Sequence, residues 1–303
     1  MPRKIIYLFN PISGTKQKSA IKSLVARKTR EQELDFEIMS TAKDGDYDFL
    51  KKKIQKESVT DVVICGGDGT VNQVVSSLKG IKVNIGIIPM GSGNGLAFAA
   101  KIPKQTSKAL EIIFNGHASP SDAFYINDQF SCMLCGIGFD ALVAHEFAKE
   151  KRRGLQTYIK VTAVNFFKTK PYLFDIKLKN KSFRTEAFFI CVANSNQFGN
   201  NFTIAPQASL ADGLLDIVIV KKMNKLMLPF SLINQVTGIN AVQRTNYHIK
   251  NKNIIYLQTD ALTITNLQSA PLHIDGDPSE TSEEFRIRVI KNCFRLLQPK
   301  GDI

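Results

Sequence analysis

The chain has 303 residues, of which 44% are hydrophobic and 22% are charged, a composition that is typical of folded globular proteins and excludes intrinsic disorder. Its 40 Lys and Arg outnumber its 27 Asp and Glu, and the net charge of +13 favours polyanionic partners such as nucleic acid, an anionic membrane or phosphate-bearing substrates. No apolar run reaches the roughly 18 residues that a transmembrane helix needs. The short apolar run near the start lacks a cleavage site, so we expect a first strand there and no signal peptide.

The first third of the chain repeats one pattern, in which a short apolar run ends at a Gly-rich or Asn-Pro loop and a helical stretch follows. The runs are KIIYLF (4–9), DVVIC (61–65) and VNIGIIP (83–89), followed by Asn10 to Gly14, GGDG (66–69) and GSGNG (91–95). This pattern predicts a parallel β-sheet with crossover helices. Loops that leave the carboxyl ends of parallel strands share one edge of the sheet, where open α/β sheets bind ligands.

The pattern changes near residue 120, where runs rich in β-branched and aromatic residues alternate with polar turns. These runs predict a second domain of antiparallel β-structure. Helical spacing appears at 155–168 and 225–238. We expect a nucleotide-binding α/β domain over 1–123 and a β-rich domain over 124–283. The last segment, 284–303, contains the strand FRIRVI (285–290), which fits either domain.

The five cysteines and four histidines show no metal-binding spacing. Cys132 and Cys135 form a C-x-x-C pair, but the run FSCMLCGIGF is typical of a strand, and no second pair completes a zinc site. We therefore expect buried, reduced thiols of the kind found in cytoplasmic proteins.

The loop GGDGT places a carboxylate, Asp68, inside a turn that is otherwise suited to binding phosphate through backbone N–H groups. The Walker pattern, the dinucleotide fingerprint and the protein kinase motifs are absent. Asp68 would repel phosphates unless it supports a divalent cation or performs acid–base chemistry. The alternative is that Asp68 only caps a helix that starts near Thr70.

Three motifs occur in order, N-P-x-S-G at Asn10 to Gly14, G-G-D-G-T at Gly66 to Thr70 and P-x-G-S-G-N at Pro89 to Asn94. They resemble the diacylglycerol kinase catalytic domain family, which includes bacterial soluble lipid kinases and the sphingosine and ceramide kinases. The resemblance continues at Gly138-Phe139-Asp140, Ala205-Pro206, Asp212 to Asp216 and Asp275 to Asp277, and it covers essentially the whole chain.

The resemblance implies an N-terminal domain similar to those of NAD kinase and phosphofructokinase, a C-terminal β-sandwich, and an active site in the cleft between them. It also implies that ATP binds to the loops of the first domain. The implied nucleotide-binding residues are Asn10, Pro11, Ser13, Gly14, Thr41, Gly66, Gly67, Asp68, Gly69, Thr70, Asn72, Ser92, Gly93 and Asn94.

The other implied site residues are acidic or belong to the DGLLD segment. The resemblance implies a structural Mg²⁺ site formed by the Asp212 side chain and the carbonyls of Ser209 and Leu214, although an ordinary turn explains this segment equally well. The family pattern Asp-Gly-Glu is Asp-Gly-Asp at 275–277, so the resemblance implies that Asp277 is the general base by position, with Asp275 close by. If the two carboxylates lie close together, one of their pKa values should rise towards a value useful for a base. Asp140 is expected to orient the acceptor hydroxyl or the metal network.

These features predict an ATP-dependent kinase that phosphorylates a hydroxyl of a diacylglycerol-like or sphingoid-like lipid, with Mg²⁺ on the phosphates and Asp68 supporting that metal. The alternatives are an NAD kinase-like enzyme, a non-catalytic nucleotide- or lipid-binding protein, and a nucleic-acid-binding protein, which rests on net charge alone. We expect a cytoplasmic protein of lipid metabolism that binds reversibly to the anionic inner membrane surface and has no nucleic-acid partner. The sequence leaves a homodimer open.

Overall fold

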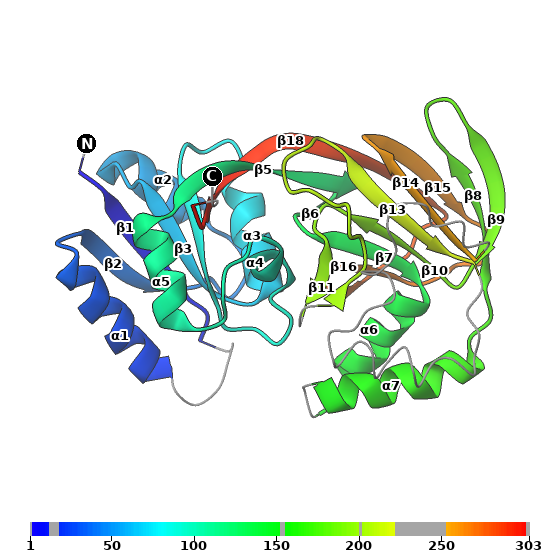
Figure 1. Cartoon of the computed structure of the whole chain (residues 1–303), viewed down its shortest axis with the longest axis horizontal. Helices are drawn as coiled ribbons and strands as arrows, with labels where there is room; N and C mark the ends of the chain where they lie inside the picture. The colour runs from blue at the N-terminus through cyan, green and yellow to red at the C-terminus, as the bar shows by residue number, and fades with distance from the viewer. Residues whose placement is uncertain (1, 12–17, 152–154, 200–201, 222–252, 301–303) are drawn as a thin grey trace. The chain divides into compact units, whose positions relative to one another are not determined.

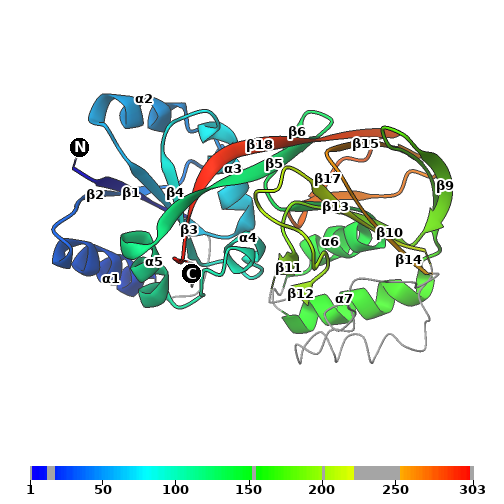
Figure 2. The same cartoon turned by 45° about the horizontal axis from the view of Figure 1, so that its top comes forward.

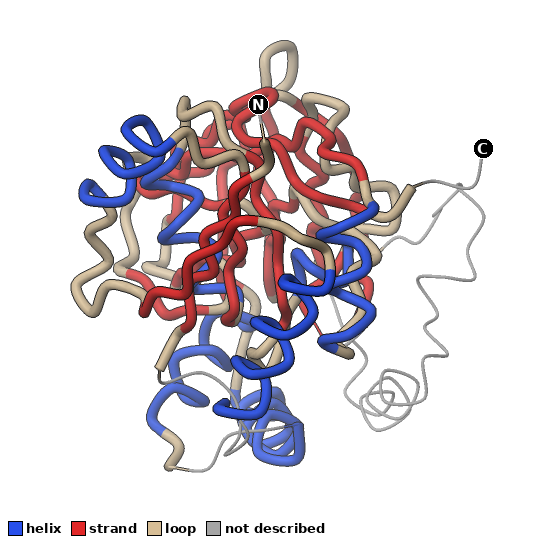
Figure 3. Tube along the Cα trace, turned by 90° about the vertical axis from the view of Figure 1, so that its left-hand side faces the viewer, coloured by secondary structure: helices blue, strands red, loops and turns tan. Residues whose placement is uncertain are grey.

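The computed structural model describes residues 2–11, 18–151, 155–199, 202–221 and 253–300. The chain divides into two compact units, Met1–Asp122 with Lys291–Ile303, and Ala123–Ile290. Figure 3 colours the strands red and the helices blue along the trace. The predicted helix at 225–238 and the predicted site residues Ser13 and Gly14 lie outside the described residues.

The first unit alternates strands and helices, as the repeated pattern of its sequence predicts. Its elements are β1 (Lys4–Phe9), α1 (Lys18–Glu31), β2 (Asp35–Ser40), α2 (Asp48–Glu57), β3 (Asp61–Gly66), α3 (Asp68–Leu78), β4 (Asn84–Pro89), α4 (Gly95–Ala99) and α5 (Thr106–Asn115). The strands are parallel in the order β2-β1-β3-β4. Helices α1 and α5 lie side by side on one face of the sheet, and α2 and α3 lie on the other (Figure 1 and Figure 2).

Apolar strands and one buried ion pair hold this sheet together. Every residue of β3 is buried, because both faces of the sheet are covered by helices. At the amino edge of the sheet, Arg3 forms an ion pair with Asp61 at 2.8 Å, and the Asp61 side chain is only 1% exposed. Asn84 of β4 donates a further hydrogen bond to Asp61 at 3.2 Å. These paired polar groups stabilise the edge opposite to the one at which the glycine loops leave.

The second unit is built from two layers of mostly antiparallel strands and two helices. One sheet has the order β14-β13-β10-β7-β16-β17, and the other contains β18-β15-β8-β9 together with β5 and β6. The elements are β5 (His117–Ile126), β6 (Gln129–Ser131), β7 (Leu134–Gly138), α6 (Phe139–Lys149), α7 (Leu155–Lys168), β8 (Tyr172–Lys177), β9 (Ser182–Ala187), β10 (Phe189–Ala193), β11 (Gln197–Gly199), β12 (Phe202–Thr203), β13 (Leu215–Val220), β14 (Ile254–Thr259), β15 (Ala261–Asn266), β16 (Leu272–Ile274), β17 (Asp277–Ser279) and β18 (Glu284–Gln298).

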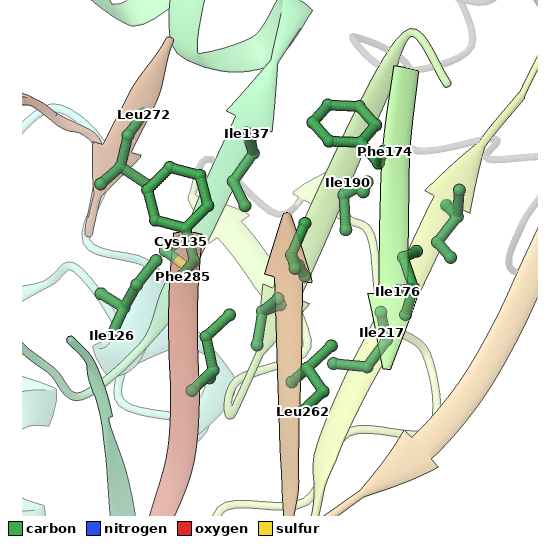
Figure 4. Packing of buried hydrophobic residues seen from close by; sticks show 14 of the residues in the cluster. Ile126, Cys135, Ile137, Phe174, Ile176, Ile190, Ile217, Leu262, Leu272 and Phe285 are labelled. Atoms are coloured by element: carbon green, nitrogen blue, oxygen red, sulfur yellow. The ribbon is translucent and has the colours of Figure 1, made fainter. Parts of the chain in front are cut away.

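The two sheets of this unit share one apolar core. Side chains of Ile137 and Ile190 from the first sheet pack with Phe174, Leu262 and Phe285 from the second, as Figure 4 shows. Every one of these residues is at most 4% exposed. Alternate residues of each strand point into this core, which is the arrangement of a β-sandwich. The fold class expected from the sequence is therefore confirmed.

Helices α6 and α7 pack against each other, and α6 covers β7, β16 and β17. The contact is aromatic, because Phe166 of α7 meets Phe139 of α6 at 5.5 Å between ring centroids and stacks on Phe188 at 5.8 Å. The predicted helix at 155–168 is confirmed, with Val161, Thr162 and Phe166 buried.

One predicted strand is interrupted in the structure, and the C-terminal strand pairs with strands of both units. The run 130–139 forms β6 and β7 with a break at Cys132 and Met133, because the backbone there turns towards a buried carboxylate that is described below. The C-terminal strand fits both units, since β18 pairs with β15 through Ala261↔Arg288 and with β4 through Asn84↔Arg295. All five cysteines are free thiols, and Cys132 and Cys135 are buried, as expected.

Candidate active site

The carboxyl ends of the parallel strands bring the predicted nucleotide-binding segments to one edge of the first unit. The backbone N–H of Asn10, which follows β1, donates to the carbonyl of Cys65 in β3 at 3.1 Å. The Asn10 side-chain amide donates to the hydroxyl of Thr70 at 2.7 Å. Thr41, which follows β2, donates its backbone N–H to the Phe9 carbonyl at 3.0 Å. Short hydrogen bonds therefore fix the relative positions of these loops.

The second and third glycine loops touch through their backbones. A Cβ atom added to Gly91 would lie 2.6 Å from the Gly67 Cα, and one added to Gly67 would lie 3.0 Å from the Gly91 Cα. Real Cβ atoms essentially never come within 3.0 Å of another atom, so Gly91 requires glycine or a shift of the loops. A Cβ atom at Gly67 would require the neighbouring backbone to move by a few tenths of an ångström. The close contact holds the two loops against each other at the edge of the sheet.

Asn94 fixes the shape of the third loop. It has a left-handed backbone, with φ of 56°, and is 2% exposed. Its side-chain oxygen accepts the N–H of Gly91 at 2.8 Å, and its side-chain nitrogen donates to the Gly91 carbonyl at 2.8 Å. Asn adopts this conformation more readily than most residues. In this structure both polar atoms of the Asn94 side chain serve the loop itself.

Asp68 occupies the first turn of α3. The helix begins at Asp68 and its N-cap residue is Gly67, which has no side chain to cap the helix. The alternative that Asp68 is the capping residue is therefore wrong, because Asp68 lies inside the helix. A carboxylate in the first turn interacts favourably with the helix dipole. It also lies on the loop whose N–H groups are suited to phosphate.

The described nucleotide-binding candidates all come from the carboxyl edge of the first sheet or the helix turn that follows it. They are Asn10 and Pro11 after β1, Thr41 after β2, Gly66, Gly67, Asp68, Gly69, Thr70 and Asn72 from β3 into α3, and Ser92, Gly93 and Asn94 after β4. The tertiary structure thus assembles segments that are up to 84 residues apart, counted from 10 to 94. Their role in binding a nucleotide stays a prediction.

In the second unit, Asp275 and Gly276 form the two-residue turn between β16 and β17. Both have positive φ, 50° and 87°, and Ile274 pairs with Asp277 across the turn. Such turns favour Asn or Asp followed by Gly, because both central residues must adopt left-handed backbone conformations. The sequence Asp-Gly-Asp therefore has a local structural reason in addition to any chemical one.

The Asp275 carboxylate is buried and fully engaged. It is 5% exposed and accepts hydrogen bonds from the Ser131 hydroxyl at 2.6 Å and from the backbone N–H groups of Met133 and Leu134 at 3.1 Å and 3.0 Å. Its other oxygen accepts the N–H of Cys132 at 3.2 Å. This carboxylate anchors the turn to the segment between β6 and β7. The geometry favours a structural role over proton abstraction.

Asp277, by contrast, is exposed at the start of β17. The two carboxylates therefore occupy different environments, one buried and one exposed. Asp277 remains the predicted base.

Asp140 lies in the first turn of α6, directly after β7. Gly138 makes the sharp change of direction, with φ of 106°, and a Cβ atom there would lie 2.5 Å from the Phe188 carbonyl oxygen. One oxygen of Asp140 accepts the N–H of Ala141 at 2.8 Å. The other lies 3.4 Å from Nε2 of His273, a residue that no sequence motif marks as functional.

The DGLLD segment forms a tight turn ahead of β13. The Asp212 carboxylate accepts the N–H of Leu214 at 3.0 Å, and Gly213 has φ of 73°. Ser209 and Asp212 are exposed. One carboxylate and two carbonyls form a hard-oxygen donor set of the kind that Mg²⁺ prefers, so the residues fit the ion in kind. In the described part of the chain, no three His, Cys, Asp or Glu side chains cluster in a way that could hold a metal ion.

The second aspartate of this segment, Asp216, is fully buried. It accepts hydrogen bonds from the Tyr256 hydroxyl and from the Gln258 amide, the latter at 3.2 Å and 3.3 Å to its two oxygens. The Tyr256 hydroxyl also accepts the N–H of Gln207 at 3.2 Å. Burial raises the pKa of the Asp216 carboxyl above its ordinary value. This network connects the loop after Ala205 to β13 and β14.

Comparison with known proteins gives the class of this fold and site. Residues 4–126 match the model of the diacylglycerol kinase catalytic domain, and residues 134–297 match the YegS C-terminal NAD kinase beta sandwich-like domain. A diacylglycerol kinase of Staphylococcus carnosus is 24% identical over 285 residues, covering 91% of this chain and 89% of that protein. A Shewanella frigidimarina protein named "Probable lipid kinase YegS-like" is 27% identical over 250 residues, covering 80% and 78%.

Solved structures share the fold. The crystal structure of a diacylglycerol kinase from Bacillus anthracis superimposes with a TM-score of 0.73 at 18% identity, covering 99% of this chain and 98% of that one. The fold and the matched domains define a two-domain lipid kinase. The chain belongs to the diacylglycerol kinase catalytic domain family. This membership favours a lipid kinase over the NAD kinase-like alternative.

Proposed function

We propose that this lipid kinase transfers the γ-phosphoryl group of ATP to a hydroxyl group of a diacylglycerol-like or sphingoid-like lipid. The observation that carries the proposal is the edge of the first sheet, where the Gly67 and Gly91 loops touch and Asn10 joins Thr70. Backbone N–H groups of glycine loops and the start of a helix such as α3 are suited to phosphate oxygens.

Each unit would contribute a different part of the reaction. The glycine loops would bind the phosphates, and Asp68, placed in the first turn of α3, would stand next to them. Mg²⁺, when bound, would neutralise charge on the transferring phosphoryl group, and Asp68 offers a carboxylate oxygen for it. In the second unit, the exposed Asp277 would accept the proton of the lipid hydroxyl, and Asp140 would orient that hydroxyl. The DGLLD turn would be a separate, structural Mg²⁺ site.

A phosphoryl-transfer assay tests this proposal. Wild-type protein is incubated with radiolabelled ATP and with diacylglycerol, sphingoid bases, ceramide, NAD or buffer alone. We expect label in a lipid product, loss of that product on chelation of Mg²⁺, and strong loss in an Asp68→Asn variant. A Glu33→Gln variant, at the turn between α1 and β2, provides a control on the same unit. Label in NAD, or in no lipid with a folded protein, would contradict the proposal.

We also propose that the protein binds reversibly to the anionic inner membrane surface from the cytoplasm. None of the helices in the described ranges has the length and hydrophobicity to span a bilayer. The net charge is +13, and one face of α7 carries the exposed residues Lys160, Val164, Phe167 and Lys168, with Val164 48% and Phe167 56% exposed. Lysines beside apolar side chains suit an anionic lipid surface.

Vesicle sedimentation tests this surface. Binding to anionic vesicles should fall steeply as salt rises, and binding to neutral vesicles should be weak. A K160Q/K168Q double variant should bind anionic vesicles less tightly, by about 1 kcal/mol for each lysine. Leu267→Ala, which changes an exposed apolar residue on a turn, serves as the control. Equal affinity for both vesicle types would point to hydrophobic docking, and unchanged binding of the double variant would exclude this face.

A further inference from the structure

His273 lies at the meeting point of three elements of the second unit. It belongs to β16, is 3% exposed, and pairs across the sheet with Gly136 of β7. Its imidazole lies between Asp140 in the first turn of α6 and the turn that carries Asp275 and Gly276. Nothing in the sequence motifs assigns it a role, because Asp140 and Gly136, which it meets in the fold, are distant along the chain.

The absence of a side chain at Gly136 creates the space for this arrangement. A Cβ atom at Gly136 would lie 1.9 Å from Oδ2 of Asp140 and 2.3 Å from Nε2 of His273. Both side chains therefore lie over the Gly136 Cα and fill the volume that any other residue would occupy. Only glycine at position 136 lets the Asp140 and His273 side chains lie this close to the strand.

The hydrogen bond at Nδ1 of His273 indicates which ring nitrogen carries the proton. The backbone N–H of Gly276 donates to Nδ1 of His273 at 3.3 Å. An imidazole nitrogen that accepts a hydrogen bond carries no proton, so the neutral ring carries its proton on Nε2. Nε2 lies 3.4 Å from Oδ2 of Asp140, which is longer than an ordinary hydrogen bond.

One oxygen of the Asp140 carboxylate lacks a hydrogen-bond donor from the residues that the structure describes. Its Oδ1 accepts the N–H of Ala141, whereas Oδ2 is buried and has no hydrogen-bond partner among the described residues. A buried carboxylate oxygen without a donor is destabilising, because it has lost its hydrogen bonds to water and gained no protein donor in their place. The Nε2–H of His273 is in position to satisfy this oxygen after a small shift of either side chain.

We infer that His273 is a positioning residue, which orients the Asp140 carboxylate through Nε2–H and is itself held by the N–H of Gly276. The inference rests on the proposed function, in which Asp140 orients the lipid hydroxyl and Asp277 takes its proton. Because Gly276 lies directly before Asp277, the ring connects the turn that carries the base to the residue that orients the acceptor. Losing this connection should lower kcat while leaving the ATP site in the other unit unchanged.

Two conservative variants separate the two contacts of the ring. Glutamine places its amide nitrogen near the position of Nε2, whereas asparagine reaches only the position of Nδ1. We expect H273Q to retain kcat within a few-fold, and H273N to lower kcat by about 10–100-fold, the range found when the partner of a functional side chain is removed. The KM for ATP should change less than twofold in both. His145→Asn is the matched control, since His145 lies on α6 and bonds the Leu272 carbonyl at 2.8 Å.

A double variant tests whether His273 acts through Asp140. Adding H273N to an Asp140→Asn protein should change kcat less than twofold, because the partner is already lost. A further 10-fold loss, or an H273N protein with wild-type kcat, would overturn the inference. Equal losses in H273Q and H273N would also overturn it, since only packing would then be at stake.

One measurement does not depend on activity. Histidine-selective ¹⁵N NMR at neutral pH reports which ring nitrogen carries the proton, and the His273 signals are identified by their loss in H273Q. We expect the neutral ring to carry its proton on Nε2. A proton on Nδ1 would refute the inference even if the kinase assay succeeds. If the wild-type protein phosphorylates no lipid, the proposed function fails, and this spectrum still decides the contact between His273 and Asp140.

Discussion

Replacing Asp275 with Asn is expected to destabilise the second unit, whereas the same change at Asp277 should leave its stability unaltered. The Asp275 carboxylate accepts bonds from Ser131, Met133 and Leu134 on one oxygen and from Cys132 on the other. Asn tolerates the left-handed backbone of this turn, so the variant changes only side-chain chemistry. Asp277 is exposed and lies two residues away, which makes it a closely matched control.

The magnitude follows from the individual bonds. In D275N the amide oxygen can take the place of the oxygen that accepts three bonds, and the amide nitrogen then faces the Cys132 N–H. Both of these groups are donors, so the buried Cys132 N–H loses its acceptor at a cost of about 1–3 kcal/mol. The three bonds to the other oxygen change from charge-assisted to neutral, each weaker by about 1 kcal/mol. Release from the cost of burying a charge offsets part of this loss. We therefore expect a decrease of about 2–4 kcal/mol in the free energy of unfolding.

Urea unfolding followed by circular dichroism measures this difference. Exposed substitutions usually change stability by less than about 0.5 kcal/mol, and D277N should fall in that range. In the kinase assay D277N should lower kcat by about 10²–10⁴-fold if Asp277 is the general base. Equal destabilisation by the two variants would refute the anchoring role of Asp275. A folded but inactive D275N beside an active D277N would identify Asp275 as the base.

Three further predictions concern other positions. Gly91→Ala places a Cβ atom 2.6 Å from the Gly67 Cα, so urea unfolding should show a loss of about 1–3 kcal/mol in the stability of the first unit. Calorimetry should show weaker ATP binding by the same variant. Gly67→Ala should have a smaller effect on both, because its Cβ atom would lie 3.0 Å from the Gly91 Cα. Asn94→Gly keeps the left-handed backbone but loses both bonds to Gly91, so thermal unfolding should show a loss of about 1–2 kcal/mol. Burial raises the pKa of Asp216 in the folded state, so the folded protein binds this proton more tightly than the unfolded chain does. The free energy of unfolding should therefore fall as the pH rises above 3.8, the ordinary pKa of the group. In urea titrations at several pH values, Asp216→Asn should make the free energy of unfolding depend less on pH.

Gly67 contacts the third loop, so a substitution there affects more than the phosphate-binding loop itself. Gly67 lies against the Gly91 backbone, so Gly67→Asp would disturb the third loop as well as any phosphate bound there. Loss of activity in that variant would not separate misfolding of the loop from charge repulsion. Asp68→Asn is the sharper test, because it changes one atom of a side chain in the first turn of α3.

The order of strands, glycine loops and helices in the first unit was readable from the sequence. Strand and helix periodicity depends on residues close together in the chain, and glycine marks the positions where the backbone must turn sharply or approach another segment. The same local rules predicted the helix at 155–168 and most strands of the second unit. The Asp-Gly dipeptide at 275–276 is typical of a two-residue hairpin turn, and the turn between β16 and β17 lies at these two residues.

Only the tertiary structure decided which of these residues meet. Asp275 meets residues 131–134, His273 meets Asp140, and each pair of segments is separated by more than 130 residues. These contacts break the strand predicted at 130–139, bury one carboxylate of the Asp-Gly-Asp turn and expose the other. No local pattern specifies them, because burial and partner choice depend on how the sheets pack and not on the spacing of residues along the chain.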